Sequence, residues 1–220
     1  TASAARQPIA MCDAELLAAE TRRSDRRSQV HALLRHLVTE GHLGADQPLL
    51  VGGDWNTPSH LDWTRDTARI FRHRRDLPLP VSLAMTDAGF VDTFRAIHPN
   101  PVQHPGLTWS PMFRENADGQ ETGFERIDRL YLKNPRTPRQ GWVLTPVAAT
   151  VLPDPWEAES IAPEDRGFPS DHGAVIIDLE WTRRPAADRP PPDGVMLDVL
   201  AFNILRGGEV PGPDVASPTY

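Results

Sequence analysis

The sequence predicts an α/β fold, in which helices and strands are mixed along one chain. Apolar residues recur at mostly helical spacing over residues 11–40, and this pattern predicts a long helix. A short apolar run at residues 48–53 predicts a buried strand, and residues 126–132 alternate like a half-buried strand. With 220 residues, the chain is long enough to bury one substantial core around these elements.

The first half is expected to contain the helix, one strand and a second helical region. A charged stretch at residues 22–27 interrupts the helix, either as a solvated face or as a break between two helices. The buried run that follows leads into a glycine turn. Residues 59–75 are expected to be irregular and locally helical, and residues 85–94 to contain a helix end, a glycine stop and a short apolar segment.

The second half is expected to be rich in strands. The strand candidates are residues 107–109, 126–132, 143–152, 174–181 and 195–204. Between them, Asp118-Gly119 predicts a hairpin turn within residues 114–123, and the acidic residues 153–169 predict a loop. Residues 183–194 hold four prolines and several charges, which indicates a linker.

Charge and hydropathy argue against several classes of protein. The formal net charge of −7 disfavours a non-specific binder of duplex nucleic acid, which needs a basic face. No apolar run reaches the roughly 18 residues of a membrane span, and no signal-peptide pattern starts at residue 1. Because there is no initiator Met, a lost targeting segment stays open, as do a secreted or cytoplasmic location and the oligomeric state. Cys12 stands alone, so no internal disulfide can form.

Polar side chains stand at the ends of two predicted strands. Gly53-Asp54-Trp55-Asn56 directly follows one apolar run, and Ser170-Asp171-His172 directly precedes another. Hydrolysis of a phosphate ester needs charge neutralisation at the phosphoryl oxygens, an aligned water and a group that moves protons. The two motifs together therefore predict a divalent metal and an attack on a phosphate ester.

Magnesium prefers carboxylate and amide oxygens as ligands. The candidate metal ligands of this type are Asp54, Asn56, Asp171 and Asn203. His172 and His60 are candidates for proton transfer, and Asp128, on the alternating strand, is the natural carboxylate to orient a histidine. His60 and Trp109 are also candidates for lining a substrate pocket.

Each of these signals has an ordinary explanation when it is taken singly. A Gly-Asp pair is often a turn, and a Ser-Asp-His triplet before a strand is often a helix cap or a loop. Arg126-Ile127-Asp128 alone would be a sheet surface with an ordinary ion pair. Their joint occurrence, their order and their placement at strand ends favour the catalytic interpretation.

The set resembles the successive motifs of the endonuclease/exonuclease/phosphatase superfamily. The matching motifs are Gly53-Asp54-Trp55-Asn56, Thr108-Trp109, Arg126-Ile127-Asp128 and Ser170-Asp171-His172. The resemblance covers roughly residues 20–182 and implies the deoxyribonuclease I-like fold, a four-layer α/β sandwich. Thr108 and Trp109 match the pattern but are expected to be packing residues.

The resemblance also implies a role for each matching polar residue. Asp54 would activate or orient the attacking water, or protonate the leaving oxygen, and Asn56 would hold the phosphoryl group. His172 would polarise the phosphate or transfer a proton, oriented by Asp128. Asp171 would lie at the metal, which is expected to be magnesium, with manganese or calcium as replacements.

The chain departs from the order of the family. The family opens with a strand that ends in Phe-Asn, whereas Phe202-Asn203-Ile204 comes last here. Three explanations stay open: a circularly permuted chain that lacks part of the fold, a boundary between two such domains, or an unrelated strand and tail. Under the first, residues 1–182 are the C-terminal two-thirds of the domain, residues 183–194 the linker and residues 195–220 the opening strand.

The metal-binding Glu and the second catalytic His of the family are not recognisable here. Glu15, Glu20 and Glu209 do not stand in a matching context. The expected function is a metal-dependent phosphoesterase that acts by direct water attack on a phosphodiester or phosphomonoester. The substrate could be a small molecule, a lipid head group or a nucleic acid, and the acidic balance favours the first two over duplex DNA. The alternative is a non-catalytic binding module that keeps the fold with an incomplete metal site.

Overall fold

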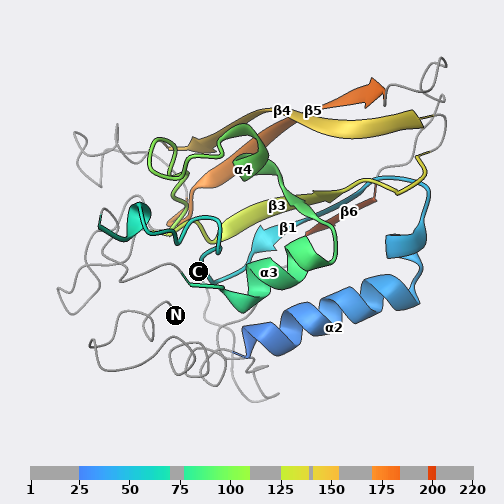
Figure 1. Ribbon diagram of the computed structural model, residues 1–220, viewed down its shortest axis with the longest axis horizontal. Helices are drawn as coiled ribbons and strands as arrows, with labels where there is room; N and C mark the ends of the chain where they lie inside the picture. Colours follow the sequence, from blue (N-terminus) through green and yellow to red (C-terminus); the bar gives the residue numbers. More distant parts are fainter. Residues whose placement is uncertain are drawn as a thin grey trace.

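A computed structural model describes residues 25–69, 77–109, 125–138, 141–153, 170–183 and 198–201. The longer elements are α2 (Arg26–Thr39), β1 (Leu49–Asp54), α3 (Pro80–Asp87), β3 (Asp128–Lys133), β4 (Trp142–Leu152) and β5 (Ala174–Arg183) (Figure 1). The shorter elements are η1 (His42–Gly44), η2 (Thr67–Arg69), β2 (Val91–Asp92), α4 (Thr93–Ile97) and β6 (Asp198–Ala201). Helices and strands are mixed along the chain, so the predicted α/β class is confirmed.

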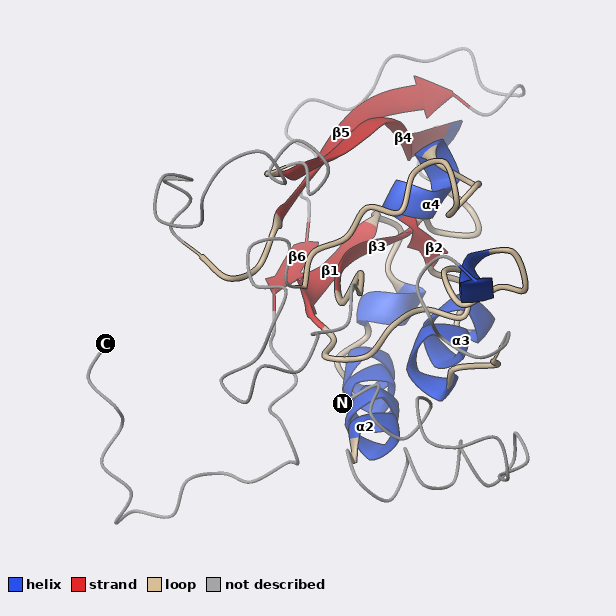
Figure 2. Ribbon diagram, turned by 90° about the vertical axis from the view of Figure 1, so that its left-hand side faces the viewer, coloured by secondary structure: helices blue, strands red, loops and turns tan. Residues whose placement is uncertain are grey.

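The strands form two separate sheets. The larger has the order β2-β3-β1-β6, in which β1 pairs antiparallel with β3 and parallel with β6. The smaller is the antiparallel pair β4 and β5. Figure 2 shows three layers: helices α2 and α3, then the four-stranded sheet, then the two-stranded sheet. The structure thus places the last described strand beside the first.

The core between the helices and the larger sheet is built on alternate strand residues. Leu49 and Val51 of β1 and Tyr131 of β3 point toward the helices. The buried cluster there consists of Val30, Leu37, Leu49, Val51, Trp55, Val81, Met85, Phe90 and Tyr131. The apolar residues that recur at helical spacing in α2 therefore cover one face of the sheet.

The core between the two sheets uses the other strand residues. Leu50 of β1, Leu132 of β3 and Leu144 of β4 form a buried cluster, so β1 is covered on both faces. This double burial explains why residues 48–53 are continuously apolar and do not alternate. Gly52 leaves room for the side chain of its strand partner Leu130, because a Cβ there would lie 3.0 Å from Leu130 Cδ1.

The described part of the charged stretch is solvated at Asp25 and Arg27 but not at Arg26. Helix α2 begins at Arg26, and Asp25 before it has a left-handed backbone with φ 49°. The side chain of Arg26 is buried at 1% exposure, so at least this arginine belongs to the interior. The helix boundary favours the predicted break over a continuous helix, although residues 11–24 lie outside the described ranges.

The elements around residue 89 confirm the sequence pattern. Pro80 opens α3 at a position where a missing N–H costs nothing, and the helix ends at Asp87. Gly89 has φ +87°, which a glycine adopts without strain, and the chain then enters β2. The turn delivers Asp92 to the N-cap of α4, where its side chain accepts a hydrogen bond from Arg95 N.

Other predictions fall partly outside the described residues. These are the hairpin turn at Asp118-Gly119, the acidic loop after Pro153, the proline-rich linker beyond Arg183 and Asn203. A fourth layer of the sandwich does not occur among the residues that the structure describes. Within the same residues, no helix combines the length and the apolar character that a membrane crossing requires.

Candidate active site

Two aspartates meet where β1 ends and β3 begins. Asp54 is the last residue of β1 and Asp128 the first of β3, and they are direct partners in the antiparallel register. Side chains of directly opposed residues lie on the same face of a sheet. The apolar run before Asp54 and the alternating pattern after Asp128 therefore place both carboxylates together.

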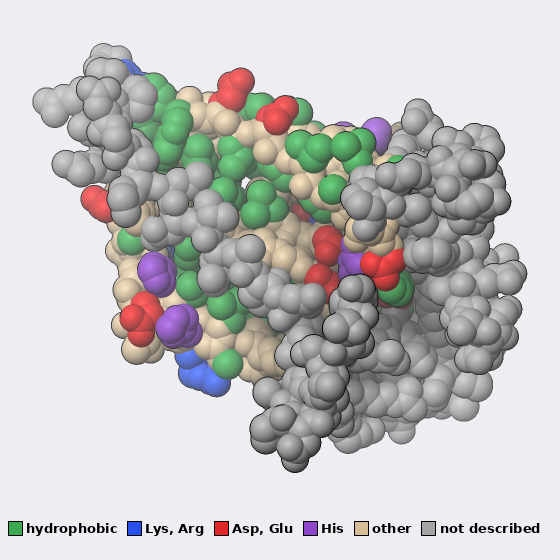
Figure 3. Space-filling view, turned by 180° about the vertical axis from the view of Figure 1, so that it is seen from behind, with side chains coloured by type: hydrophobic (Ala, Val, Ile, Leu, Met, Phe, Trp, Pro, Cys, Tyr) green, Lys and Arg blue, Asp and Glu red, His purple; other side chains and the backbone are tan. Residues whose placement is uncertain are grey.

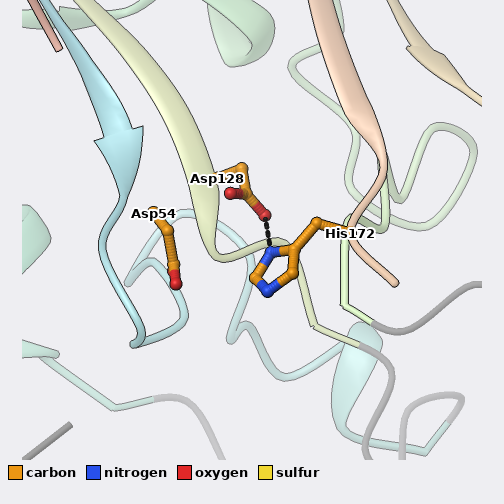
Figure 4. A group of neighbouring side chains, drawn as sticks. All are labelled: Asp54, Asp128 and His172. Carbon is orange, nitrogen blue, oxygen red and sulfur yellow. Dashed lines mark hydrogen bonds and ion pairs between the residues drawn. The ribbon is translucent and has the colours of Figure 1, made fainter. Parts of the chain in front are cut away.

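His172 approaches this pair from the other sheet, just before β5. Its Nδ1 lies 2.9 Å from Asp128 Oδ2 (Figure 4). Asp54, Asp128 and His172 each offer a ligand atom, and these atoms all lie within 4.8 Å of one another. We call these three residues the active-site group. Their side chains are partly accessible, with 27% of His172 and 20% of Asp128 exposed.

Within the active-site group, the pKa values of Asp54 and His172 are both raised. Burial raises the pKa of Asp54, and the nearby charge of Asp128 raises it further. The hydrogen bond to Asp128 raises the pKa of His172, against the opposing effect of burial. Two carboxylates that share a partly buried site repel each other, and a cation between them relieves the repulsion.

Asn56 is held beside Asp54 by a tight local turn. Its backbone is left-handed, with φ 52°, a conformation that asparagine tolerates better than most residues. Its N–H donates to Asp54 Oδ1 at 2.7 Å, and its Nδ2 donates to Asp54 Oδ2 at 2.5 Å. Arg26 Nη2 donates to Asn56 Oδ1 at 3.5 Å. These contacts turn the Nδ2 of the Asn56 amide toward the Asp54 carboxylate and its Oδ1 toward Arg26.

Thr108 and Trp109 lie between the two strands that carry the Asp128–His172 pair. Trp109 forms isolated bridges with Glu125 and His172, and its ring lies 4.7 Å from the His172 ring. Thr108 is fully buried, and its hydroxyl accepts hydrogen bonds from Ile127 N and Asp128 N. The predicted short strand at residues 107–109 is thus present as a pair of single-residue bridges.

The remaining candidates occupy different positions. His60 is tied to α3, because its Nδ1 lies 2.8 Å from Ser82 Oγ, and burial lowers its pKa. Asp171 is exposed and adds to the raised pKa of His172, but it is not part of the active-site group. Asn203 lies outside the described residues. The structure therefore unites Asp54, Asn56, Asp128 and His172 and leaves His60 apart from the metal-capable group.

Sequence reasoning missed a buried network next to this site. Arg126, for which the sequence suggested no role beyond its place in the Arg126-Ile127-Asp128 motif, is only 2% exposed and donates to both Asp62 and Asp92. Arg95 adds an ion pair to Asp62 at 2.6 Å. We call Asp62, Asp92, Arg95 and Arg126 the arginine network. The signal that could have revealed it is weak: an arginine directly before an apolar residue at the start of a strand.

The active-site group fits a divalent cation by its donor set. Two neighbouring carboxylates suit a hard divalent cation, and Asp54, whose pKa is raised by burial, would gain from one. Figure 3 shows acidic and histidine side chains gathered at one place on this face of the molecule.

Comparison with known proteins supplies independent information. The profile of the Endonuclease/Exonuclease/phosphatase family matches residues 7–172, which include every residue of the active-site group. An uncharacterized protein of Caenorhabditis elegans is 38% identical over 141 residues, which are 62% of this chain and 42% of that protein. The chain thus spans less than half the length of this curated relative.

Proposed function

Because the chain belongs to the endonuclease/exonuclease/phosphatase family, we propose that it is a metal-dependent phosphoesterase. It hydrolyses a phosphodiester or phosphomonoester by direct attack of water. The observation that carries this proposal is the approach of Asp54, Asp128 and His172 to within 4.8 Å at the meeting point of two sheets. The family resemblance makes a deoxyribonuclease I-like four-layer sandwich the proposed architecture.

Asp54 and Asn56 act on the attacking water and the phosphoryl group. Burial and Asp128 raise the pKa of Asp54, which makes this carboxylate a better base and allows it to protonate a leaving oxygen. Asn56 is fixed by its bonds to Asp54, so its amide is oriented before a substrate arrives. Such preorganisation supports an asparagine that holds the phosphoryl oxygens in the transition state.

His172 carries the proton, and Asp128 orients it. The Asp128 carboxylate accepts from Nδ1–H, which leaves Nε2 directed to the substrate. The raised pKa keeps His172 protonated to higher pH, so Nε2–H can polarise a phosphoryl oxygen or donate to it. A bound divalent cation would neutralise charge on the phosphoryl oxygens and on the two carboxylates. We propose magnesium, with Asp171 and Asn203 as further ligands.

The pairing of β6 supports the inclusion of Asn203. This strand runs parallel to β1, with Ala201 opposite Gly52. The carboxyl ends of parallel strands meet at one edge of a sheet, which is where ligands bind in open α/β sheets. This pairing also favours the permuted arrangement, or a neighbouring domain of the same type, over an unrelated tail.

The substrate proposed is a small or lipid-derived phosphoester. The net charge of −7 opposes the approach of duplex DNA, whose backbone is itself densely negative. A small phosphoester carries one or two charges, which a divalent cation at the active-site group would offset. Nucleic acid remains the other substrate class that the test below includes.

The test is turnover of His172→Ala and Asp171→Ala on bis(p-nitrophenyl) phosphate, p-nitrophenyl phosphate and an oligonucleotide, each with magnesium. Loss of His172 is expected to lower kcat about 10²–10⁴-fold, the usual contribution of a positioned acid or base. Asp171→Ala is expected to abolish turnover through loss of metal. The matched control is His31→Ala, which removes an exposed histidine from α2.

Unchanged turnover in His172→Ala would contradict this mechanism. Titration calorimetry with magnesium separates the two function classes. Absence of both metal binding and turnover on all three substrates would favour a binding module that retains the fold.

A further inference from the structure

We propose that Thr108 is a positioning residue that holds Asp128 and His172 at hydrogen-bonding distance across the two sheets. The inference rests on the proposed function, which gives this pair its catalytic role. Asp128 belongs to the four-stranded sheet, whereas His172 precedes a strand of the two-stranded sheet. A hydrogen bond between different sheets needs something that fixes their separation at that point.

Thr108 holds the Asp128 side through its hydroxyl. The side chain is 0% exposed, and Oγ1 accepts from Ile127 N and from Asp128 N, each at 3.0 Å. Asp128 is the first residue of β3, and the side chain of Thr108 gives its N–H an acceptor where the strand begins. Without the hydroxyl, two backbone donors at this position lose that acceptor.

Thr108 holds the His172 side through its backbone. Its carbonyl accepts from Gly173 N at 2.7 Å, directly after His172. Gly173 is packed so closely that an added Cβ would lie 2.9 Å from Val151 Cγ1 and 3.3 Å from Thr108 Cα. Trp109 continues the contact by bridging to His172 and placing its ring against the imidazole.

One residue therefore hydrogen-bonds to both segments that carry the pair. Its hydroxyl accepts from Asp128 N, and its main-chain carbonyl accepts from Gly173 N beside His172. Removal of the hydroxyl alone releases the Asp128 side and keeps the other contact. The expected defect is a misplaced Asp128, which weakens the 2.9 Å bond to Nδ1 and leaves the global fold in place.

The experiment compares Thr108→Val, which keeps the shape and loses the hydroxyl, with Thr108→Ser, which keeps the hydroxyl. The matched control is Thr93→Val, because Thr93 is equally buried and its hydroxyl donates to Leu130 O of the same strand β3, at 2.7 Å. The readout is the downfield proton NMR signal of His172 Nδ1–H in metal-free protein. His172→Gln assigns the signal.

We expect Thr108→Val to shift the signal upfield and to speed its exchange with water about tenfold, the weight of one ordinary hydrogen bond. Thr108→Ser should restore it, and Thr93→Val should leave it unchanged. Where turnover is measured, kcat should fall about tenfold in Thr108→Val, with KM altered less than about twofold.

The two proposals fail in different ways. An unchanged Nδ1–H signal in Thr108→Val, an equal change in Thr93→Val, or no restoration by serine would overturn the role of Thr108. Absence of turnover in the wild-type protein would overturn the proposed function, while the NMR comparison still decides whether Thr108 positions the pair.

Discussion

Two neighbouring groups of charged side chains differ in how their charges are balanced. The arginine network joins two aspartates to two arginines, and the side chains of its Arg126–Asp92 pair are each 1% exposed. The active-site group joins two aspartates to a single histidine, and it is partly open to solvent. In the first group the two arginines balance the two aspartates, whereas the second would gain stability from a cation.

The pKa shifts express the same contrast. Burial alone would raise the pKa of Asp62, but Arg126 and Arg95 outweigh it and lower that pKa. In the active-site group the pKa of Asp54 is raised, because burial and Asp128 outweigh the stabilising contacts. The two arginines thus outweigh the effect of burial on the pKa of Asp62, whereas the contacts of Asp54 do not outweigh the effect of burial on its pKa.

Breaking the arginine network should have the largest effect on stability. Arg126→Met leaves Asp92 and Asp62 buried with part of their compensation removed, and we expect a loss of about 3–5 kcal/mol in the free energy of unfolding. Urea denaturation followed by circular dichroism measures this loss. Arg35→Met, on the exposed side of α2, is the control and should behave like the wild type. Equal stability of the two variants would show that the network is dispensable.

Binding of a divalent cation at the active-site group should have an intermediate effect on stability. Magnesium at about ten times its Kd should raise the Tm by a few degrees, because about 1.4 kcal/mol of binding energy is added to the native state.

The raised pKa of Asp54 means that folding favours its protonated form. That stability is fully present below the ordinary value of 3.8 and is lost as the pH rises through the raised pKa.

The magnesium shift should therefore grow as the pH rises through the pKa of Asp54, since the ionised carboxylate binds the cation. Differential scanning fluorimetry between about pH 4 and 7 measures this trend. Asp54→Asn should remove most of the shift at all pH values. An equal shift in this variant would place the metal elsewhere.

Separating the histidine from its aspartate should have the smallest effect on stability. The pKa of His172 is raised from 6.5, so the charged pair contributes stability that is fully present below 6.5 and lost as the pH rises through the higher value. In Asp128→Asn the pKa of His172 should fall toward 6.5. NMR titration of the imidazole in metal-free protein measures both values, and an unchanged pKa would contradict the pairing.

The parts of the molecule that the sequence could predict are those with a local pattern. The apolar run before Asp54 and the alternation after Asp128 depend on neighbours in the chain, and both strands occur where expected. The family motifs also predicted the contact between Asp128 and His172, 44 residues apart. That contact could not have been derived from periodicity alone.

The arginine network had no comparable signal. Arg126 reaches Asp92 and Asp62, which lie 34 and 64 residues away in irregular or short segments. An arginine in an alternating strand is usually solvated, and only the tertiary structure shows that this one is buried. Thr108 was expected to pack, which its full burial bears out, but its two accepted hydrogen bonds depend on a strand about 20 residues downstream.

The parallel pairing of β1 with β6 also has a consequence during synthesis. The partners lie about 150 residues apart, so a ribosome completes β1 long before its neighbour exists. Throughout that interval the open edge of β1 presents unpaired backbone groups that another chain could join. That edge stays open until residues 198–201 pair with β1, the strand that ends in Asp54.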